Sequence, residues 1–287
     1  MDGRGAWNTK YWDIVDQIYW APQYMGMKSI PQKYWRVEAD TIAVPAERVN
    51  KSGPLYTRSR SADVHKSWML RQEEVLNHVF DLTFAIAPDN LIGSCFAQPL
   101  GIRDPGPYES LGREIRQRYG WTRSENVTQH DGLFVSPNSA LGVEIKLRAR
   151  SSQAQVVKYA SLFAWEEMRA GPLDHLGLLY ILEEPADTRH WRECGLTGPH
   201  IDSGLLDSVD IATLPRKIRE LIGTDRSKVS SALDRMVLGA ITWGELRDGC
   251  VDFCQDLDDG RPGDQTLIRL VSGLIAQIDA QVQRSDA

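Results

Sequence analysis

The chain lacks the long apolar runs, the cysteine density and the basic excess that mark several large classes of protein. It has 287 residues and only 4 cysteines, and no apolar stretch approaches the ~18 residues that suggest a membrane span. The N-terminal sequence MDGRGAWNTKYWDIVDQ carries charges and Trp where a signal peptide requires an apolar core. We therefore expect a soluble, cytoplasmic protein with no membrane partner.

The few cysteines do not form a recognisable metal or disulfide pattern. Cys250 and Cys254 would share one face of a helix, but no further Cys or His stands nearby at zinc-ligand spacing. We predict that both, like Cys95 and Cys194, are buried and reduced, because free Cys commonly serves as a small core residue. A Gly-x-Ser-x-Gly elbow, a Walker loop and a dinucleotide fingerprint are also missing from the sequence.

The charge is unevenly distributed. The net charge is −6, which does not by itself indicate a nucleic-acid-binding protein. Residues 107–160 nevertheless hold 8 Lys and Arg against 5 Asp and Glu, whereas residues 201–287 hold 10 against 15. A local basic groove is compatible with this distribution, but tight and indiscriminate coating of DNA is not.

The hydrophobic patterns predict an α/β organisation. Interval 98–107 contains three prolines and is a candidate boundary. Strand patterns are found at 34–44, 126–135, 141–149 and 176–182, with a turn at SPNS (136–139). Helical patterns are found at 7–20, from Asp63 to about Ala85, at 108–119, from Ser151 or Ser152 to about Met168, and near 213–222, 227–239, 244–255 and 264–284.

One predicted strand carries a candidate site. In LGVEIKLRAR (141–150), alternation places an apolar set of side chains on one face and Glu144, Lys146, Arg148 and Arg150 on the other. Asp131 precedes Glu144 by 13 positions, on the far side of the SPNS turn. An antiparallel hairpin across that turn would bring the two carboxylates together.

Two converging carboxylates form the oxygen-rich, anionic pocket that Mg²⁺ or Mn²⁺ requires, and the main-chain carbonyl of Ile145 would complete the metal shell. A neighbouring ammonium group, here that of Lys146, can orient the attacking water and neutralise charge in the transition state. These features predict metal-dependent hydrolysis of a phosphodiester. A surface hairpin with cross-strand charge pairs would show the same residues, and this alternative stays open on the motif alone.

The order of these residues resembles the PD-(D/E)XK nuclease superfamily over roughly residues 108–182. The resemblance implies a restriction-endonuclease-like α/β fold, a small mixed sheet flanked by helices in the order α-β-β-β-α-β. Our patterns supply only two strands between the two helices. Segment YESLGREIRQRYGW (108–121) looks like the opening helix of archaeal-type Holliday-junction resolvases. That likeness implies that Glu109 supports the metal, with Glu114 as the competing residue.

RecB-like exonucleases carry Gln-x-x-x-Tyr on the next helix, and Gln155 and Tyr159 match this pattern. The resemblance implies that they steady a phosphate or Lys146. We also expect the basic residues Arg148, Arg150 and Lys158 to contact backbone phosphates. The family's Pro before the Asp is replaced by His130, which would donate to the scissile phosphate or make a structural hydrogen bond.

We therefore expect a nuclease core at 98–189, a mainly helical N-terminal region at 1–97 and a helical C-terminal region at 190–287. The expected activity is that of a Mg²⁺- or Mn²⁺-dependent deoxyribonuclease of the restriction, repair or defence type, an endonuclease rather than an exonuclease. Its partner would be double-stranded DNA, with a homodimer as a possible assembly. One alternative is a catalytically silent nuclease-fold module that binds nucleic acid or protein. Another is a regulator whose C-terminal helices form a winged-helix or dimerisation unit.

Overall fold

The computed structural model describes residues 73–111, 115–121, 130–146, 151–201 and 204–282. Phe80–Leu257 form one compact unit that contains the whole sheet. A second unit includes α11 (Pro262–Val282), which confirms the helix predicted near 264–284. The helix predicted at 7–20 and the strand predicted at 34–44 lie outside the described residues. Within the described part, no helix has the length and apolarity needed to cross a membrane.

The sheet has five strands whose spatial order follows the chain. The first three strands pair antiparallel, and the last three pair parallel. Parallel neighbours require long crossover connections, and helices supply them between β3 and β4 and between β4 and β5. The strands are β1 (Glu109–Ser110), β2 (Gly132–Val135), β3 (Ser139–Ile145), β4 (His175–Leu182) and β5 (Met236–Thr242). An α/β protein with a small mixed sheet flanked by helices is thus confirmed.

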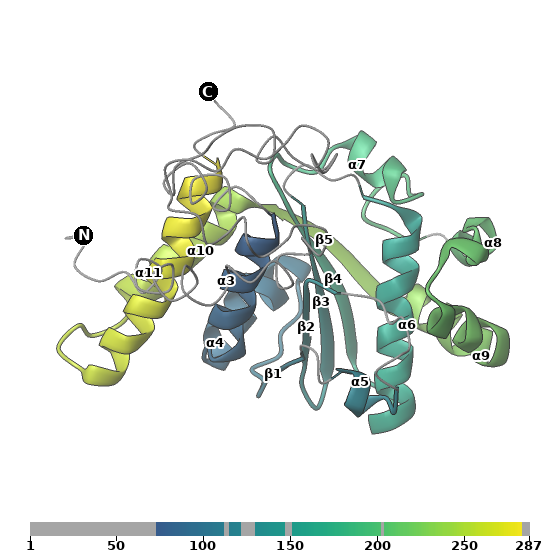
Figure 1. The fold of residues 1–287 in the computed structure, drawn as a ribbon, viewed down its shortest axis with the longest axis horizontal. Helices are drawn as coiled ribbons and strands as arrows, with labels where there is room; N and C mark the ends of the chain where they lie inside the picture. The colour runs from purple at the N-terminus through teal and green to yellow at the C-terminus, as the bar shows by residue number, and fades with distance from the viewer. Residues whose placement is uncertain (1–72, 112–114, 122–129, 147–150, 202–203, 283–287) are drawn as a thin grey trace, which may run out of the picture. The chain divides into compact units, whose positions relative to one another are not determined.

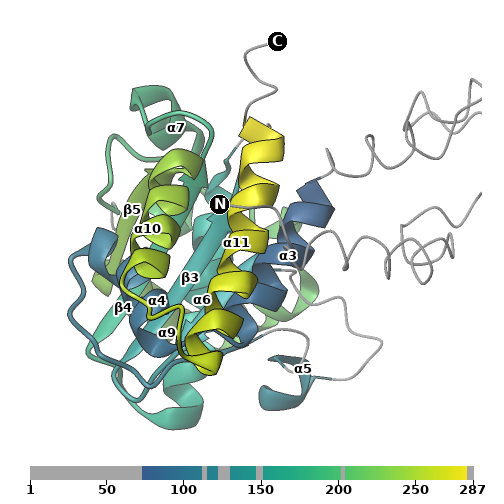
Figure 2. The same ribbon diagram turned by 90° about the vertical axis from the view of Figure 1, so that its left-hand side faces the viewer.

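The helices of this unit cover both faces of the sheet (Figure 1). One face is covered by α6 and α9, and the other by α4, η4 and α10, which Figure 2 views from the front. The helical elements are α3 (Glu73–Ala85), α4 (Asp89–Ile92), η4 (Gly93–Ala97), η5 (Gln98–Leu100), α5 (Ile115–Arg118), α6 (Gln153–Ala170), α7 (Thr188–Glu193), α8 (Leu205–Ser208), η6 (Ile211–Thr213), α9 (Arg216–Arg235) and α10 (Trp243–Gln255).

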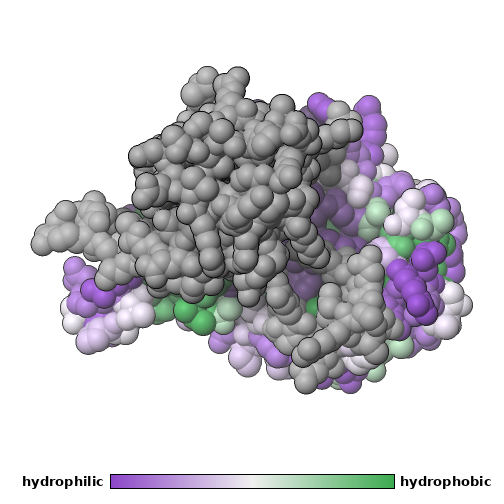
Figure 3. All heavy atoms as spheres, viewed as in Figure 1, coloured by the Kyte–Doolittle hydropathy of each residue, from purple (hydrophilic) through white to green (hydrophobic). Residues whose placement is uncertain are grey.

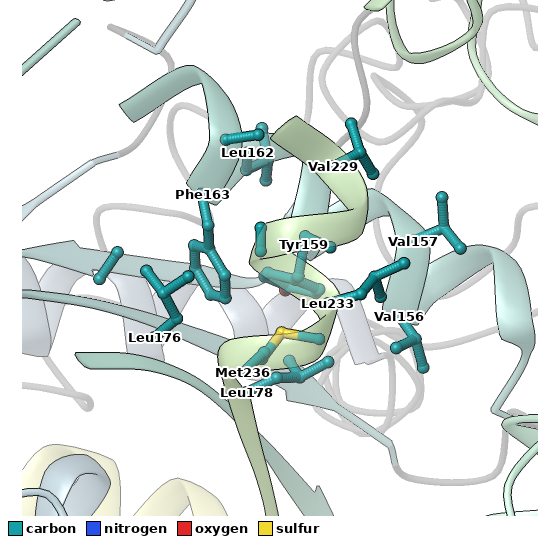
Figure 4. Packing of buried hydrophobic residues seen from close by; sticks show 14 of the residues in the cluster. Val156, Val157, Tyr159, Leu162, Phe163, Leu176, Leu178, Val229, Leu233 and Met236 are labelled. Atoms are coloured by element: carbon teal, nitrogen blue, oxygen red, sulfur yellow. The ribbon is translucent and has the colours of Figure 1, made fainter. Parts of the chain in front are cut away.

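The larger part of the core lies between the sheet and α6 with α9 (Figure 4). Helix α6 presents Tyr159 and Phe163 to Leu176 and Leu178 of β4, and Met236 of β5 closes the same cluster. Helix α9 buries apolar residues at helical spacing and leaves its charged residues outward, so that hydrophilic groups are prominent on the α8–α9 side (Figure 3). This packing fixes α6 against the sheet.

The β2–β3 hairpin forms as the SPNS turn predicted. The amide of Ser136 donates to the carbonyl of Ser139 over 2.8 Å. The hydroxyls of both serines donate to the carboxylate of Asp104, which is buried in a loop of the preceding 98–107 interval. A buried carboxylate is tolerated where hydrogen bonds to its charged form replace water. Asp104 therefore anchors the end of the hairpin that lies opposite Glu144.

Two strands occupy segments for which the patterns predicted helices. The helix predicted at 108–119 is wrong at its start, where Glu109–Ser110 pair with β2. Among the described residues of this segment, Ile115–Arg118 form a helical turn. The helix predicted at 227–239 ends instead at Arg235, and the apolar run MVLGAIT forms β5. A short apolar run does not distinguish a buried strand from a buried helix, so its pairing with β4 decides the outcome. The sheet thus takes a strand from beyond residue 189.

The other predicted elements of this unit are present with small changes of boundary. Helix α6, strand β4 and helix α10 match the predictions for 151–168, 176–182 and 244–255. The helix predicted near 213–222 is the first part of α9, which continues through a kink at Asp225. All 4 cysteines lie within the described part and are free and buried, as predicted.

Gly142 provides a test of how closely α6 sits on the sheet. A Cβ atom at this position of β3 would lie 2.3 Å from Cδ1 of Tyr159, a fully buried ring. We expect Gly142→Ala to lower the free energy of unfolding by about 1–3 kcal/mol, because the ring has no space into which to move. Gly223→Ala is the control: its Cβ in α9 would meet nothing within 4 Å, and we expect a gain of about 0.5–1 kcal/mol. Urea unfolding measures both, and equal stability of the two variants would contradict the packing.

Candidate functional site

The β2–β3 hairpin brings Asp131 and Glu144 to the same end of the sheet. The last pair of the ladder is Gly132 with Val143, so the next residues of the two strands stand opposite each other. The amide of Ile145 donates to Oδ2 of Asp131 over 2.9 Å. The carboxylate of Asp131 therefore lies beside the main chain that follows Glu144.

Glu144 is the centre of a buried charge cluster on the α6 face. Glu144 is only 3% exposed. The Nζ atom of Lys146 lies 3.0 Å from Oε1, and the Nζ atom of Lys158 lies 3.0 Å from Oε2. Alternation along β3 thus places Glu144 and Lys146 on one face, and α6 contributes Lys158 from above. The sequence did not predict this second ion pair, although Lys158 stands three residues after Gln155 on the same side of the helix.

Gln155 connects the start of α6 to this cluster. Its Oε1 accepts a hydrogen bond from the amide of Ser152 over 2.9 Å, which forms half of a capping box. Its Nε2 donates to Oε1 of Glu144. The oxygen of the Gln155 side chain faces a donor and its nitrogen faces an acceptor, so the orientation of the amide is determined. Gln155 holds the carboxylate of Glu144 rather than Lys146, to which the resemblance pointed.

Tyr159 supports the site from inside the core. It is fully buried, and its hydroxyl donates to the carbonyl of Val143 while accepting from the amide of Asp131. The hydroxyl thereby ties α6 to both strands of the hairpin. A group without exposed surface does not contact a phosphate, so the predicted phosphate contact of Tyr159 is wrong, and Tyr159 positions the backbone around Asp131.

The two carboxylates have opposite pKa shifts. Burial, followed by the negative charge of Glu144, raises the pKa of Asp131 to about 6. Burial also disfavours the charged form of Glu144, but the ammonium groups of Lys158 and Lys146 outweigh it and hold the pKa of Glu144 below its usual value. Near neutral pH the site therefore contains an ionised Glu144 and an Asp131 whose charged form is disfavoured by burial and by the charge of Glu144.

This arrangement fits a divalent cation. The oxygen donors are the carboxylates of Asp131 and Glu144, and Ile145 directs its carbonyl to the same side as its amide, toward Asp131, as strand geometry requires. A bound cation would also neutralise the charge that raises the pKa of Asp131. Within the described residues no group of three or more His, Cys, Asp and Glu side chains could hold a metal. Water or a substrate oxygen would therefore fill several positions, as is usual for Mg²⁺.

Residues of β4 and α7 form a second wall of the site, and the sequence analysis did not predict them. Tyr180 pairs with Glu144 in the parallel ladder, so both side chains lie on the α6 face. The ring of His190 packs edge-on against Tyr180, with centroids 4.8 Å apart. Nδ1 of His190 lies 3.3 Å from the hydroxyl of Ser151, and burial lowers the pKa of this histidine. A neutral imidazole therefore stands close to the Glu144 cluster.

Glu109 does not join the site. It lies in β1 opposite Val135, four residues along β2 from Asp131, which corresponds to about 13 Å at roughly 3.3 Å per residue. Its side chain is 59% exposed and pairs with Arg118 over 2.7 Å. The prediction that Glu109 supports the metal is therefore wrong. Its segment is a strand, and Glu109 lies at the end of the hairpin opposite to Asp131. The competing Glu114 lies outside the described residues.

The predicted nucleic-acid contacts have different outcomes. Lys158 is buried in the Glu144 cluster, with its Nζ 4.7 Å from the centroid of the Tyr159 ring. His130 is partly buried, and its Nε2 lies 2.5 Å from the carbonyl oxygen of Leu111, which favours the structural alternative. Arg148 and Arg150 lie outside the described residues.

Comparison with protein-family models, with curated proteins and with solved structures finds no match for this chain.

The pH dependence of stability in an Asp131 variant tests the charge balance of the site. The folded-state Asp131 pKa of about 6 exceeds the value of 3.8 for the free side chain, so ionisation of Asp131 opposes folding increasingly between those two pH values and fully above them. Asp131→Asn keeps an oxygen for the Ile145 amide and removes the charge. We expect the variant to match wild type below about pH 4 and to be more stable by roughly 1–3 kcal/mol above about pH 6.

Urea unfolding across this pH range, without added metal, measures the difference. The exposed Asp174, just before β4, offers a matched control, because Asp174→Asn removes the same charge at the opposite end of the sheet. A loss of stability in Asp131→Asn at neutral pH would show that its charge is already compensated.

Proposed function

We propose that this chain is a metal-dependent nuclease that hydrolyses phosphodiester bonds in DNA. The observation that carries the proposal is the convergence of Asp131, Glu144 and the Lys146 ammonium group at one end of the β2–β3 hairpin. The supporting features are a mixed sheet with three antiparallel strands followed by a parallel one across a helix, and the Gln155 contact from that helix. The restriction-endonuclease-like fold is part of the same proposal.

In this function Asp131, Glu144 and the carbonyl of Ile145 would hold Mg²⁺ or Mn²⁺. When bound, such a cation polarises a phosphodiester and lowers the pKa of a coordinated water. The side chains of Asp131 and Glu144 carry two negative charges, and Lys146 and Lys158 carry two positive ones. Addition of a divalent cation makes this group net positive, which complements the anionic backbone of DNA.

Lys146 orients the attacking water and neutralises the charge that grows on the phosphate oxygens. Glu144 keeps the ammonium group of Lys146 in place through their ion pair of 3.0 Å. Gln155 and Lys158 fix the rotamer of Glu144 in turn, so the site is held rigid before the substrate arrives. Arg148 and Arg150 continue the polar face of the sequence beyond Lys146 and would contact flanking phosphates.

A second function, a silent nuclease-fold module that binds nucleic acid or protein, is favoured by one observation. Both oxygens of Glu144 already have ammonium partners, so the cluster is satisfied without a cation. A cation that binds Glu144 must therefore displace or share one of these partners. The two functions differ in whether the chain binds Mn²⁺ at this site and cleaves DNA.

Supercoiled plasmid, linear duplex, single-stranded DNA and RNA should each be incubated with the protein and Mg²⁺ or Mn²⁺. We expect nicking of the closed plasmid, which has no ends and therefore reports an endonuclease. Asp131→Asn and Lys146→Met should each lower the rate on the order of 100-fold or more, because each removes charge that acts in the transition state. Asp174→Asn should cleave as wild type does.

Mn²⁺ binding, measured by electron paramagnetic resonance, separates the roles of these residues. It should be lost in Asp131→Asn and retained in Lys146→Met. Because Asp131→Asn is expected to be the more stable protein, its inactivity would not reflect unfolding. Absence of cleavage on all four substrates, with no Mn²⁺ bound by wild type, would favour the silent module.

A further inference from the structure

The main chain of Lys146 is held by two elements that lie far away in the sequence. Its amide donates to the carbonyl of Ile181 in β4 over 2.9 Å. Its carbonyl accepts a hydrogen bond from the indole Nε1 of Trp243 over 3.1 Å. Trp243 is fully buried and stands 97 positions after Lys146. Both polar groups of the peptide backbone at Lys146 thus have defined partners.

The parallel ladders explain how Trp243 reaches this point. Ile145, Ile181 and Ile241 form one row across β3, β4 and β5, so the two residues after Ile241 lie at the same edge of the sheet as Lys146. Adjacent strands are about 4.8 Å apart, and an indole spans much of the width of β4. A smaller side chain at this position would not bring a donor to the Lys146 carbonyl.

Trp243 is itself held in place by the start of α10. Thr242 and Glu245 form a capping box, in which the Glu245 amide donates to the Thr242 hydroxyl over 3.1 Å. Trp243 is therefore the first residue of a well-capped helix and has little freedom in its backbone. Burial fixes the ring as well. The β5–α10 junction is thus a rigid support for the end of β3.

We propose that Trp243 is a positioning residue that fixes the main chain of Lys146 and, through it, places the Lys146 ammonium group. This role rests on the proposed nuclease function for its effect on catalysis. Strand β3 ends at Ile145, and at Lys146 the bond to β4 holds only the amide side of the residue. The indole hydrogen bond holds the carbonyl side and thereby constrains the next peptide group. Without the Trp243 hydrogen bond, the main chain at Lys146 can rotate, and the Lys146 ammonium group is no longer held in one position beside Glu144.

The test removes the indole N–H while preserving the core. Trp243→Phe retains an aromatic ring, and replacement by benzothienylalanine retains the full shape of the indole with sulfur in place of the N–H. Displacement of a catalytic group by about 1 Å costs on the order of 100-fold in rate. We expect both variants to lower kcat about 10- to 100-fold and to leave KM within about threefold, because a contact made in the ground state would change KM instead.

Trp121→Phe is the matched control. Trp121 is also buried, but its indole packs against Trp165, with ring centroids 4.6 Å apart, and not against the main chain of Lys146. An equal loss of kcat in Trp121→Phe would show that the Trp243 variants act through general core packing, and it would contradict the positioning role. Unchanged kcat in the benzothienylalanine protein would overturn the positioning role.

A second readout does not depend on cleavage. The Cε resonance of Lys146, assigned by its disappearance in Lys146→Met, should shift in both Trp243 variants and not in Trp121→Phe. If wild type cleaves no substrate, the nuclease function fails, and this resonance still decides the positioning role. If wild type cleaves and the resonance is unmoved by the Trp243 variants, the positioning role alone fails.

Discussion

The ionised carboxylate of Glu144, buried at the end of a central strand, is the constraint on which the site depends. A carboxylate removed from water is strongly destabilising unless opposite charges and hydrogen bonds replace its hydration. Lys146 can supply one charge from the same strand, but a second must come from another element. Helix α6 provides it with Lys158 and adds the amide of Gln155. The position of α6 over β3 is therefore set by electrostatics as well as by apolar packing.

The apolar packing and the charge cluster reinforce each other through Tyr159. Its ring lies directly on Gly142, where only hydrogen occupies the space between helix and strand. Its hydroxyl reaches past that contact to the Val143 carbonyl and the Asp131 amide. Close packing of α6 thus determines the backbone of both site strands. Burial and the negative charge of Glu144 raise the pKa of Asp131, so ionisation of Asp131 lowers the stability of this packed arrangement.

Sequence patterns predicted the parts of the fold that depend on local periodicity. Alternation along 141–147 placed Glu144 and Lys146 on one face, and the SPNS turn predicted the hairpin that brings Asp131 beside them. Helical spacing predicted α6 and α10. Strand β1 was missed because two paired residues carry no periodic pattern, and the helical spacing of 108–119 dominated the prediction. Strand β5 was missed because a continuous apolar run fits either a buried helix or a buried strand.

The sequence by itself determined which residues of β3 share a face, because side-chain alternation is a property of any strand. It also predicted the hairpin and the approach of Asp131 to the end of β3. Only the tertiary structure decided that Glu109 lies at the wrong end of β2, that Lys158 pairs with Glu144, and that Trp243 meets the carbonyl of Lys146. These three outcomes depend on strand order and register between distant segments, which no local pattern encodes.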